Sequence, residues 1–314
     1  MPEVTPERNR TAIDRPLNQN VNTAADTPLT SIASLLLVLY LVWGSTYLGI
    51  KITVATIPPF YAMSARFLLA GAALYLFLRL RGKPNPTIGQ WAASSLIGGL
   101  LLVGGTGLVT LAEALGVSSG VAAVLVSTMP LWLALFVRLD GKRVGWLEWV
   151  GMAVGLAGVG VLNLGSDLRA SAVGGVLLFL APISWAFGSF WSSKVRQANG
   201  LMASAAQMLT SGVMFAVLGL MRGEAFVRLP SLSSGVALLY LATFGSLLAY
   251  SAYVSLLARG VRPAVVASYA YVNPVVAVLL GVLLVGERVS GTGLVGMSVI
   301  IVGVVLAVGA KTKA

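Results

Sequence analysis

The residues that could do chemistry in this chain are aromatic and hydroxyl side chains set within long apolar stretches. Tyr40, Trp43 and Tyr47 recur at helical spacing, so they would share one face of a helix. A ring that carries a hydroxyl or an indole NH can contact an apolar group and still bind a polar one. Such a face suits a small molecule with a polar head and an apolar tail.

Further polar and aromatic residues fall in other apolar stretches, and we predict that they line the same cavity. These hydroxyl, indole and amide side chains are Trp185, Ser189, Ser246, Tyr250, Ser268, Tyr271 and Asn273. The competing explanation for the aromatic residues is the belt that forms at a membrane surface, and it fits Tyr253, Tyr240 and Trp191. It fits Tyr40 and Trp43 poorly, because both lie near the middle of their stretch.

Ionisable residues within apolar stretches are costly in a membrane and are therefore functional candidates. Lys51, Arg66 and Glu113 are expected at one common depth, near one membrane face. We hypothesise that Glu113 pairs with Lys51 or Arg66 in a gate. The simpler alternative is a Lys51 that snorkels and a Glu113 at the interface, but it explains Arg66 poorly.

Missing residue types also narrow the chemistry. The chain contains no Cys and no His, so it has no thiol nucleophile, no His general base and no His ligand for a metal. An intramembrane aspartyl enzyme needs two Asp within its spans, and a serine enzyme typically relies on a His. The Asp residues fall in the expected tail and loops: Asp14, Asp26, Asp140 and Asp167. We therefore expect no enzyme activity, no cofactor and no metal.

The composition is that of a polytopic membrane protein. Hydrophobic residues make up 57% of the 314 and charged residues only 10%, and the mean hydropathy is +0.91. The net charge of +11 could indicate nucleic-acid binding. However, the basic residues fall almost entirely between apolar runs, which the positive-inside rule explains better. We expect membrane lipid and a small-molecule substrate as partners, and no nucleic acid.

Ten apolar runs of about 20 residues predict an all-α protein with ten transmembrane helices. The runs are residues 32–53, 59–80, 89–112, 117–138, 144–164, 172–194, 200–221, 234–258, 263–285 and 290–309. Assigning alternate loops to opposite sides places 15 of the 21 Lys and Arg on one side and four on the other, so both termini should be cytoplasmic. Residues 1–31 predict a disordered cytoplasmic tail, and residues 310–314 a short one.

The two halves of the chain are related by a repeat. Gly116 and Pro130 recur 144 residues later as Gly260 and Pro274. Each half holds five spans, and an odd number places the second half upside down relative to the first. The sequence therefore predicts two inverted repeats, residues 32–164 and 172–309, an architecture typical of secondary transporters although duplication also builds some channels.

Proline and glycine predict how these helices bend and pack. Pro130, Pro182 and Pro274 each lack the amide that a helix interior needs, so each should bend its helix and line the pore, either as a static kink or as a hinge. Gly151 and Gly155 have the small-xxx-small spacing that lets helices approach closely, within a monomer or between two copies.

Four short motifs and the two five-span halves resemble the EamA-type drug/metabolite transporters over residues 32–309. The motifs are Trp43-Gly44-Ser45, Arg66-Phe67, Tyr271-Val272-Asn273-Pro274-Val275 and Gly286-Glu287-Arg288. The resemblance implies a ten-helix carrier of the bacterial inner membrane with a central cavity, closest to exporters of aromatic and other neutral amino acids. Nucleotide-sugar and triose-phosphate carriers are similar in fold, so the fold alone does not determine the substrate.

We therefore predict a monomeric carrier that exports aromatic and other neutral amino acids by alternating access. No Asp or Glu lies at mid-membrane, so we expect a facilitator driven by the substrate gradient rather than by proton exchange. A phosphorylated substrate would require several cations at the cavity, where only Arg66 is expected with Lys51 beyond it, so a nucleotide-sugar or phosphorylated-sugar carrier ranks second. A multidrug exporter is a further alternative.

Overall fold

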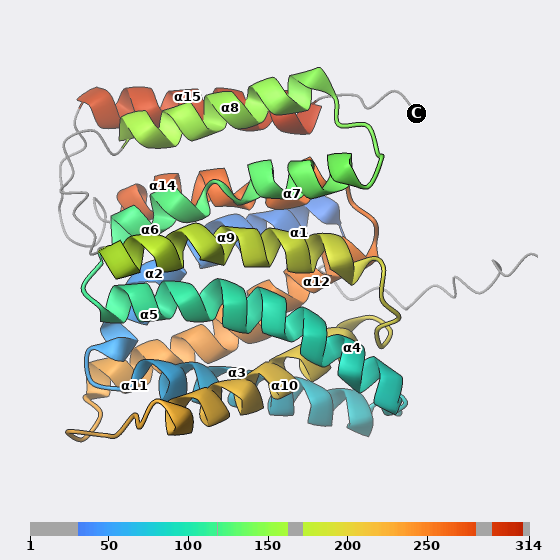
Figure 1. The fold of residues 1–314 in the computed structure, drawn as a ribbon, viewed down its shortest axis with the longest axis vertical. Helices are drawn as coiled ribbons and strands as arrows, with labels where there is room; N and C mark the ends of the chain where they lie inside the picture. The colour runs from blue at the N-terminus through green and yellow to red at the C-terminus, as the bar shows by residue number, and fades with distance from the viewer. Residues whose placement is uncertain (1–30, 118, 163–171, 281–290, 310–314) are drawn as a thin grey trace, which may run out of the picture.

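The protein is a bundle of helices that lie side by side (Figure 1). The computed structural model describes residues 31–117, 119–162, 172–280 and 291–309, and these residues form helices and turns without a β-strand. The predicted tails therefore lie outside the described residues, except for Ser31. In Figure 1, α1 begins and α15 ends at the same side of the bundle. We call this the α7 side, because α7 also ends there, and the opposite side the α2 side.

Six helices are long and apolar enough to cross a membrane in the part of the chain that is described. They are Ile32–Val54, Pro59–Leu80, Ile88–Ala114, Ala172–Ser192, Leu201–Met221 and Leu232–Ala258. They comprise α1–η1–α2, α3, α4–η2–α5, α9, α10 and α11–η3–α12, of which Figure 1 labels the α-helices. The shorter helices are α6 (Ser119–Val126), α7 (Met129–Leu139), α8 (Trp146–Leu162), α13 (Pro263–Ala267), α14 (Tyr269–Leu280) and α15 (Gly291–Gly309). All-helical membrane architecture is thus confirmed, while the count of ten crossings stays a prediction.

Three of the long helices contain a π-helical segment. The segments are η1 (Leu39–Trp43), between α1 (Ile32–Val38) and α2 (Gly44–Val54); η2 (Gly99–Gly107), between α4 (Ile88–Gly98) and α5 (Leu108–Ala114); and η3 (Leu241–Tyr250), between α11 (Leu232–Tyr240) and α12 (Ser251–Ala258). A π-helical turn changes the hydrogen-bond register, so freed carbonyls need other donors. Ser184 donates to the Leu100 carbonyl of η2 at 2.8 Å, and the Trp43 indole donates to the Gly245 carbonyl of η3 at 3.0 Å.

The three prolines behave differently from one another. Pro130 lies in the first turn of α7, where its missing amide costs little, and the chain is interrupted just before it at residues 127 and 128. Pro182 and Pro274 lie inside α9 and α14. A second interruption, at Ser268, separates α13 from α14 six residues before Pro274. Two apolar segments are therefore broken helices, a feature that transporters place around their binding sites.

Two tightly packed helix pairs form the opposite ends of the bundle, α8 with α15 and α3 with α10 (Figure 1). A Cβ on Gly151 of α8 would lie 2.4 Å from the Ala307 nitrogen of α15, so only glycine permits this approach. Gly71 of α3 meets Leu209 of α10 in the same way, with a Cβ position 2.9 Å from its nitrogen. The Gly151 face therefore packs within one copy of the chain.

Candidate functional site

A cavity lies between the two end pairs of helices, with an empty volume of about 660 Å³ that includes open solvent. Its walls come from η1, α2, α3, η2, α5, α6, α7, α9, η3 and α14. Its aromatic and polar lining residues are Trp43, Thr46, Tyr47, Arg66, Phe67, Thr106, Trp185, Tyr250, Tyr269 and Asn273. Along η1 and α2 the lining runs from Trp43, at mid-helix, to Ile50. The cavity therefore extends from the middle of the bundle toward the α2 side.

Trp43 is the centre of an aromatic cluster at the inner end of this cavity. Its ring centroid lies 4.7 Å from that of Tyr269, 5.4 Å from Trp185 and 5.2 Å from Tyr253. The contacts with Tyr269 and Trp185 are edge-to-face, the arrangement that aromatic quadrupoles favour. Because the Trp43 indole NH is bonded to η3, the ring orientation is fixed, and the cluster presents a preformed aromatic surface to the cavity.

Among the described residues that line the cavity, one carries a positive charge, the guanidinium of Arg66. Arg66 is 4% exposed; its Nε donates to the Ser246 hydroxyl at 2.7 Å, and its Cζ lies 4.9 Å from the centre of the Phe67 ring. Within the described residues no carboxylate pairs with Arg66, and no hydrogen bond satisfies its Nη2. A buried cation without an anion is costly, so the guanidinium favours a negatively charged group in the cavity.

Asn273 supplies a complementary polar group. Its side chain is 2% exposed and lines the same cavity, and its Oδ1 accepts no hydrogen bond from any described residue. A buried amide oxygen without a donor is destabilising, and a bound group with an NH could satisfy it. The described lining of the cavity thus offers a positively charged hydrogen-bond donor, a hydrogen-bond acceptor that has no donor, and an aromatic surface.

The predicted cavity residues divide into lining and supporting groups. Trp43, Tyr47, Trp185, Tyr250 and Asn273 line the cavity, and Pro182 lines it as well. Four others lie behind the lining and fix the helices: Ser246 accepts from Arg66, Tyr40 bonds to Ser268 at 2.6 Å, and Ser189 bonds to Tyr253 at 2.5 Å. Pro130 and Pro274 are buried but are not among the lining residues.

The placement of Tyr271 corrects the prediction that it lines the cavity. Its ring packs against Gly155 of α8, with a Cβ position on that glycine 3.3 Å from the ring. Residues two apart on a helix point to nearly opposite sides, so Asn273 and Tyr271 cannot both face the cavity. Tyr269, four residues before Asn273, occupies the position instead. The spacing of four residues between Tyr269 and Asn273 places both on one helix face, and this was the sequence signal that could have predicted Tyr269 as a lining residue.

The gate pairing predicted for Glu113 does not form in this structure. Lys51 is exposed near the end of α2 and has no ion-pair partner among the described residues, and Arg66 bonds to Ser246 rather than to a carboxylate. The Glu113 carboxyl is 5% exposed and interacts electrostatically with Tyr47. A similar expected depth is therefore not enough to pair these residues: Lys51 is exposed whereas Arg66 and Glu113 are buried, and Arg66 bonds to Ser246.

In the half of the bundle toward the α7 side, buried side chains such as Tyr253 and Gln207 fill the space next to the cavity. Tyr253 bonds to the Trp185 indole at 2.9 Å as well as to Ser189. Next to it, the Tyr250 hydroxyl donates to Gln207 at 2.6 Å, and Gln207 donates to Gln197 in the turn between α9 and α10. This Tyr250–Gln207–Gln197 chain joins the cavity wall to the surface. The sequence analysis did not predict a role for Gln207. The available signal was that a single amide side chain lies within a mainly apolar stretch of its helix.

A family model confirms the relationship that the motifs indicate. The model of the EamA-like transporter family matches residues 30–164 and again residues 172–309. The chain belongs to the EamA-like transporter family.

Relatives of this EamA-like transporter include proteins from several bacteria and a plant. It is 47% identical to the "Uncharacterized inner membrane transporter YedA" of Escherichia coli (strain K12), over 86% of this chain and 88% of the relative. It is 30% identical to "Protein PecM" of Dickeya dadantii, over 82% and 85%. One solved crystal structure shares the fold, with a TM-score of 0.70 at 21% identity, covering 88% of this chain and 96% of the other.

These similarities confirm the predicted family, the predicted membrane location and the general function of membrane transport. The EamA-like transporter is a multi-pass protein of the bacterial inner membrane, and it carries out membrane transport. Several of the relatives are named as transporters, which is consistent with the expected lack of catalysis. The names do not identify a substrate.

Proposed function

We propose that this EamA-like transporter exports aromatic and other neutral amino acids across the inner membrane by alternating access. The observation that carries the proposal is the combination of Arg66 and Asn273 in one aromatic cavity. An amino acid has a carboxylate for the guanidinium, an ammonium group for the vacant amide oxygen, and a side chain for the aromatic surface. Each polar group of the cavity then gains the partner that it lacks.

The electrostatics favour a zwitterion over the alternative substrates. A phosphorylated or nucleotide sugar carries about two negative charges and typically needs several Lys or Arg. Among the described lining residues Arg66 is the only basic one. A cationic drug would be repelled by the guanidinium, and the described lining residues include neither Asp nor Glu to attract it. The same lack of an acidic residue supports a facilitator without proton exchange.

The packing supports an inverted repeat that alternates between two states. Counted over ten crossings, the second helix packs on the seventh (α3 on α10) and the fifth on the tenth (α8 on α15). The third and eighth crossings both contain π-helical segments, η2 and η3, each bonded to a side chain of the other half. With cytoplasmic termini, the α7 side is cytoplasmic, and the filled half of the bundle is a closed cytoplasmic path.

The proposal is tested with purified transporter in liposomes loaded with radiolabelled phenylalanine. We expect efflux that needs no imposed pH gradient and that unlabelled phenylalanine inhibits. Phenethylamine lacks the carboxylate and 3-phenylpropionate lacks the ammonium group, so both should compete about 10-fold to 100-fold less well, the worth of one charged hydrogen bond. A nucleotide sugar that competes better than phenylalanine would overturn the proposal.

Two variants connect this preference to the structure. Arg66→Gln should lose the discrimination between phenylalanine and phenethylamine, whereas Arg66→Lys retains the charge and part of the discrimination. Asn273→Leu should lose the discrimination against 3-phenylpropionate instead. Unchanged discrimination in folded Arg66→Gln protein would refute the role of the guanidinium.

A further inference from the structure

A second hollow lies on the outside of the bundle, between α7, α8 and α9. It has an empty volume of about 770 Å³ and is lined by Leu131, Trp132, Leu135, Trp149 and Phe179, with Thr128 and Leu125 at its inner end. Its one hydroxyl, on Thr128, already donates to the Leu125 carbonyl. The hollow is therefore mainly apolar in its described lining, and we call it the lateral groove.

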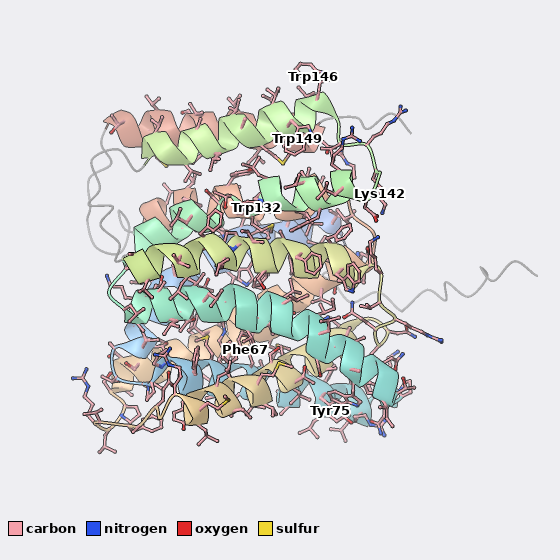
Figure 2. The ribbon with its side chains drawn as sticks, viewed as in Figure 1. Phe67, Tyr75, Trp132, Lys142, Trp146 and Trp149 are labelled. Carbon is pink, nitrogen blue, oxygen red and sulfur yellow. The ribbon has the colours of Figure 1, made fainter. Side chains whose placement is uncertain are left out.

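The lateral groove exists because α8 packs mainly on α15 and touches α7 only slightly. Trp132 of α7 and Phe179 of α9 meet edge-to-face with ring centroids 5.7 Å apart and form the floor. Phe179 is 53% exposed and Leu135 is 37% exposed, so the groove opens outward. In Figure 2, Trp149 projects from α8 toward α7, whereas Trp146 projects away from the bundle. An opening on this surface of a membrane protein faces lipid chains.

Basic residues stand at the α7 side of the lateral groove. Leu131, Leu135 and Arg138 are spaced four and three residues apart on α7, so all three lie on the helix face that lines the groove, with Arg138 nearest the α7 side. Lys142 and Arg143 follow in the turn between α7 and α8, and all three cations are exposed. The two acids nearby are already engaged, Asp140 with Lys194 at 2.5 Å and Glu148 with Arg262 at 3.4 Å. Arg138, Lys142 and Arg143 have no carboxylate partner among the described residues.

We propose that the lateral groove is a binding site for an anionic phospholipid. One acyl chain lies between α7 and α8 against Trp132 and Trp149, and the phosphate lies against Arg138, Lys142 and Arg143. Trp146, which is 74% exposed beside these cations, marks the membrane interface at which headgroups lie. Charge complementarity distinguishes this occupant from a second copy of the chain, which would present the same cations to its partner.

Brominated lipids test the proposal, because bromine on an acyl chain quenches a tryptophan that it contacts. The transporter is reconstituted in vesicles of equal parts phosphatidylglycerol and phosphatidylcholine, with bromine on one lipid or the other, so the composition stays constant. The Trp149 signal is the emission of the wild type minus that of Trp149→Phe. Trp146→Phe gives a matched control, because Trp146 shares the surface charge but not the groove.

We expect brominated phosphatidylglycerol to quench the Trp149 signal at least about tenfold more than brominated phosphatidylcholine, since each of the three nearby cations favours an anionic lipid about fivefold. The Trp146 signal should show a smaller ratio. Replacing Arg138, Lys142 and Arg143 by Gln should remove the Trp149 preference, and phosphatidylglycerol should no longer copurify with the protein. Equal ratios for Trp149 and Trp146, or a Trp149 that neither lipid quenches because a second copy covers it, would overturn the proposal.

Discussion

Replacing Gln207 by Leu should open the α7 side of the transporter. Gln207 is 1% exposed and links the Tyr250 hydroxyl to Gln197, so leucine leaves the Tyr250 hydroxyl buried without an acceptor. A buried polar group that loses its partner costs about 1–3 kcal/mol. This cost applies to the conformation in which the α7 side is closed and the Tyr250 hydroxyl is buried. A conformation that is open on the α7 side avoids the cost, because water can then bond to the hydroxyl. A shift of about 2 kcal/mol favours the open conformation roughly 30-fold.

Cysteine labelling measures this shift, since the chain contains no native Cys. Ser189→Cys places a thiol beside Tyr253 in the filled half, where Ser189 is 4% exposed. In vesicles with the cytoplasmic face outward, the rate of reaction with an impermeant maleimide should rise about 30-fold when Gln207→Leu is added.

The matched control is Ser204→Ala on the same helix, α10. Ser204 is buried and its hydroxyl has no hydrogen-bond partner among the described residues, so its removal breaks no link and should leave the labelling rate unchanged. An unchanged rate in folded Gln207→Leu protein would show that the Tyr250–Gln207–Gln197 chain does not hold the α7 side closed.

Three further outcomes follow from the packing. Trp43→Phe keeps the ring but loses the bond to the η3 carbonyl, so we expect a loss of about 1–3 kcal/mol in stability and a raised KM for phenylalanine efflux. Gly104→Ala would place a Cβ 2.0 Å from the Ser184 hydroxyl and should cost about 1–3 kcal/mol in a thermal unfolding assay, whereas Gly160→Ala, with open space around it, should not. Lys51→Gln should leave efflux unchanged, because this exposed side chain has no ion-pair partner in the described structure; a large loss would restore the gate hypothesis.

The sequence determined the helical elements and the polar residues worth attention. Long apolar runs must satisfy their backbone hydrogen bonds internally in lipid, which leaves helices as the solution for this chain. A charged side chain within a membrane costs free energy, so the sequence also indicated a functional role for Arg66, and the structure places Arg66 in the cavity lining. The motif order identified the family, because the motifs depend only on residue type and spacing.

Tertiary structure decided which face of each helix meets the cavity. In a membrane protein both the lipid-facing and the protein-facing sides are apolar, so hydrophobic periodicity does not orient a helix. Tyr269 and Tyr271 illustrate this: either could face the cavity by composition, and contact with Gly155 of α8 shows that Tyr271 is buried on the side away from the cavity. Arg66 likewise could have paired with Glu113 by depth, but the neighbouring η3 segment offers Ser246 first.

The π-helical segments were also beyond the reach of the sequence. Their extra residue per turn arises where side chains of the other half, such as Trp43 and Ser184, bond to the freed carbonyls. Those donors lie far away in the chain, more than 80 residues in the case of Ser184 and Leu100. Residue type and local spacing thus determined the helices and the family, whereas contacts between distant segments decided the shape and chemistry of the cavity.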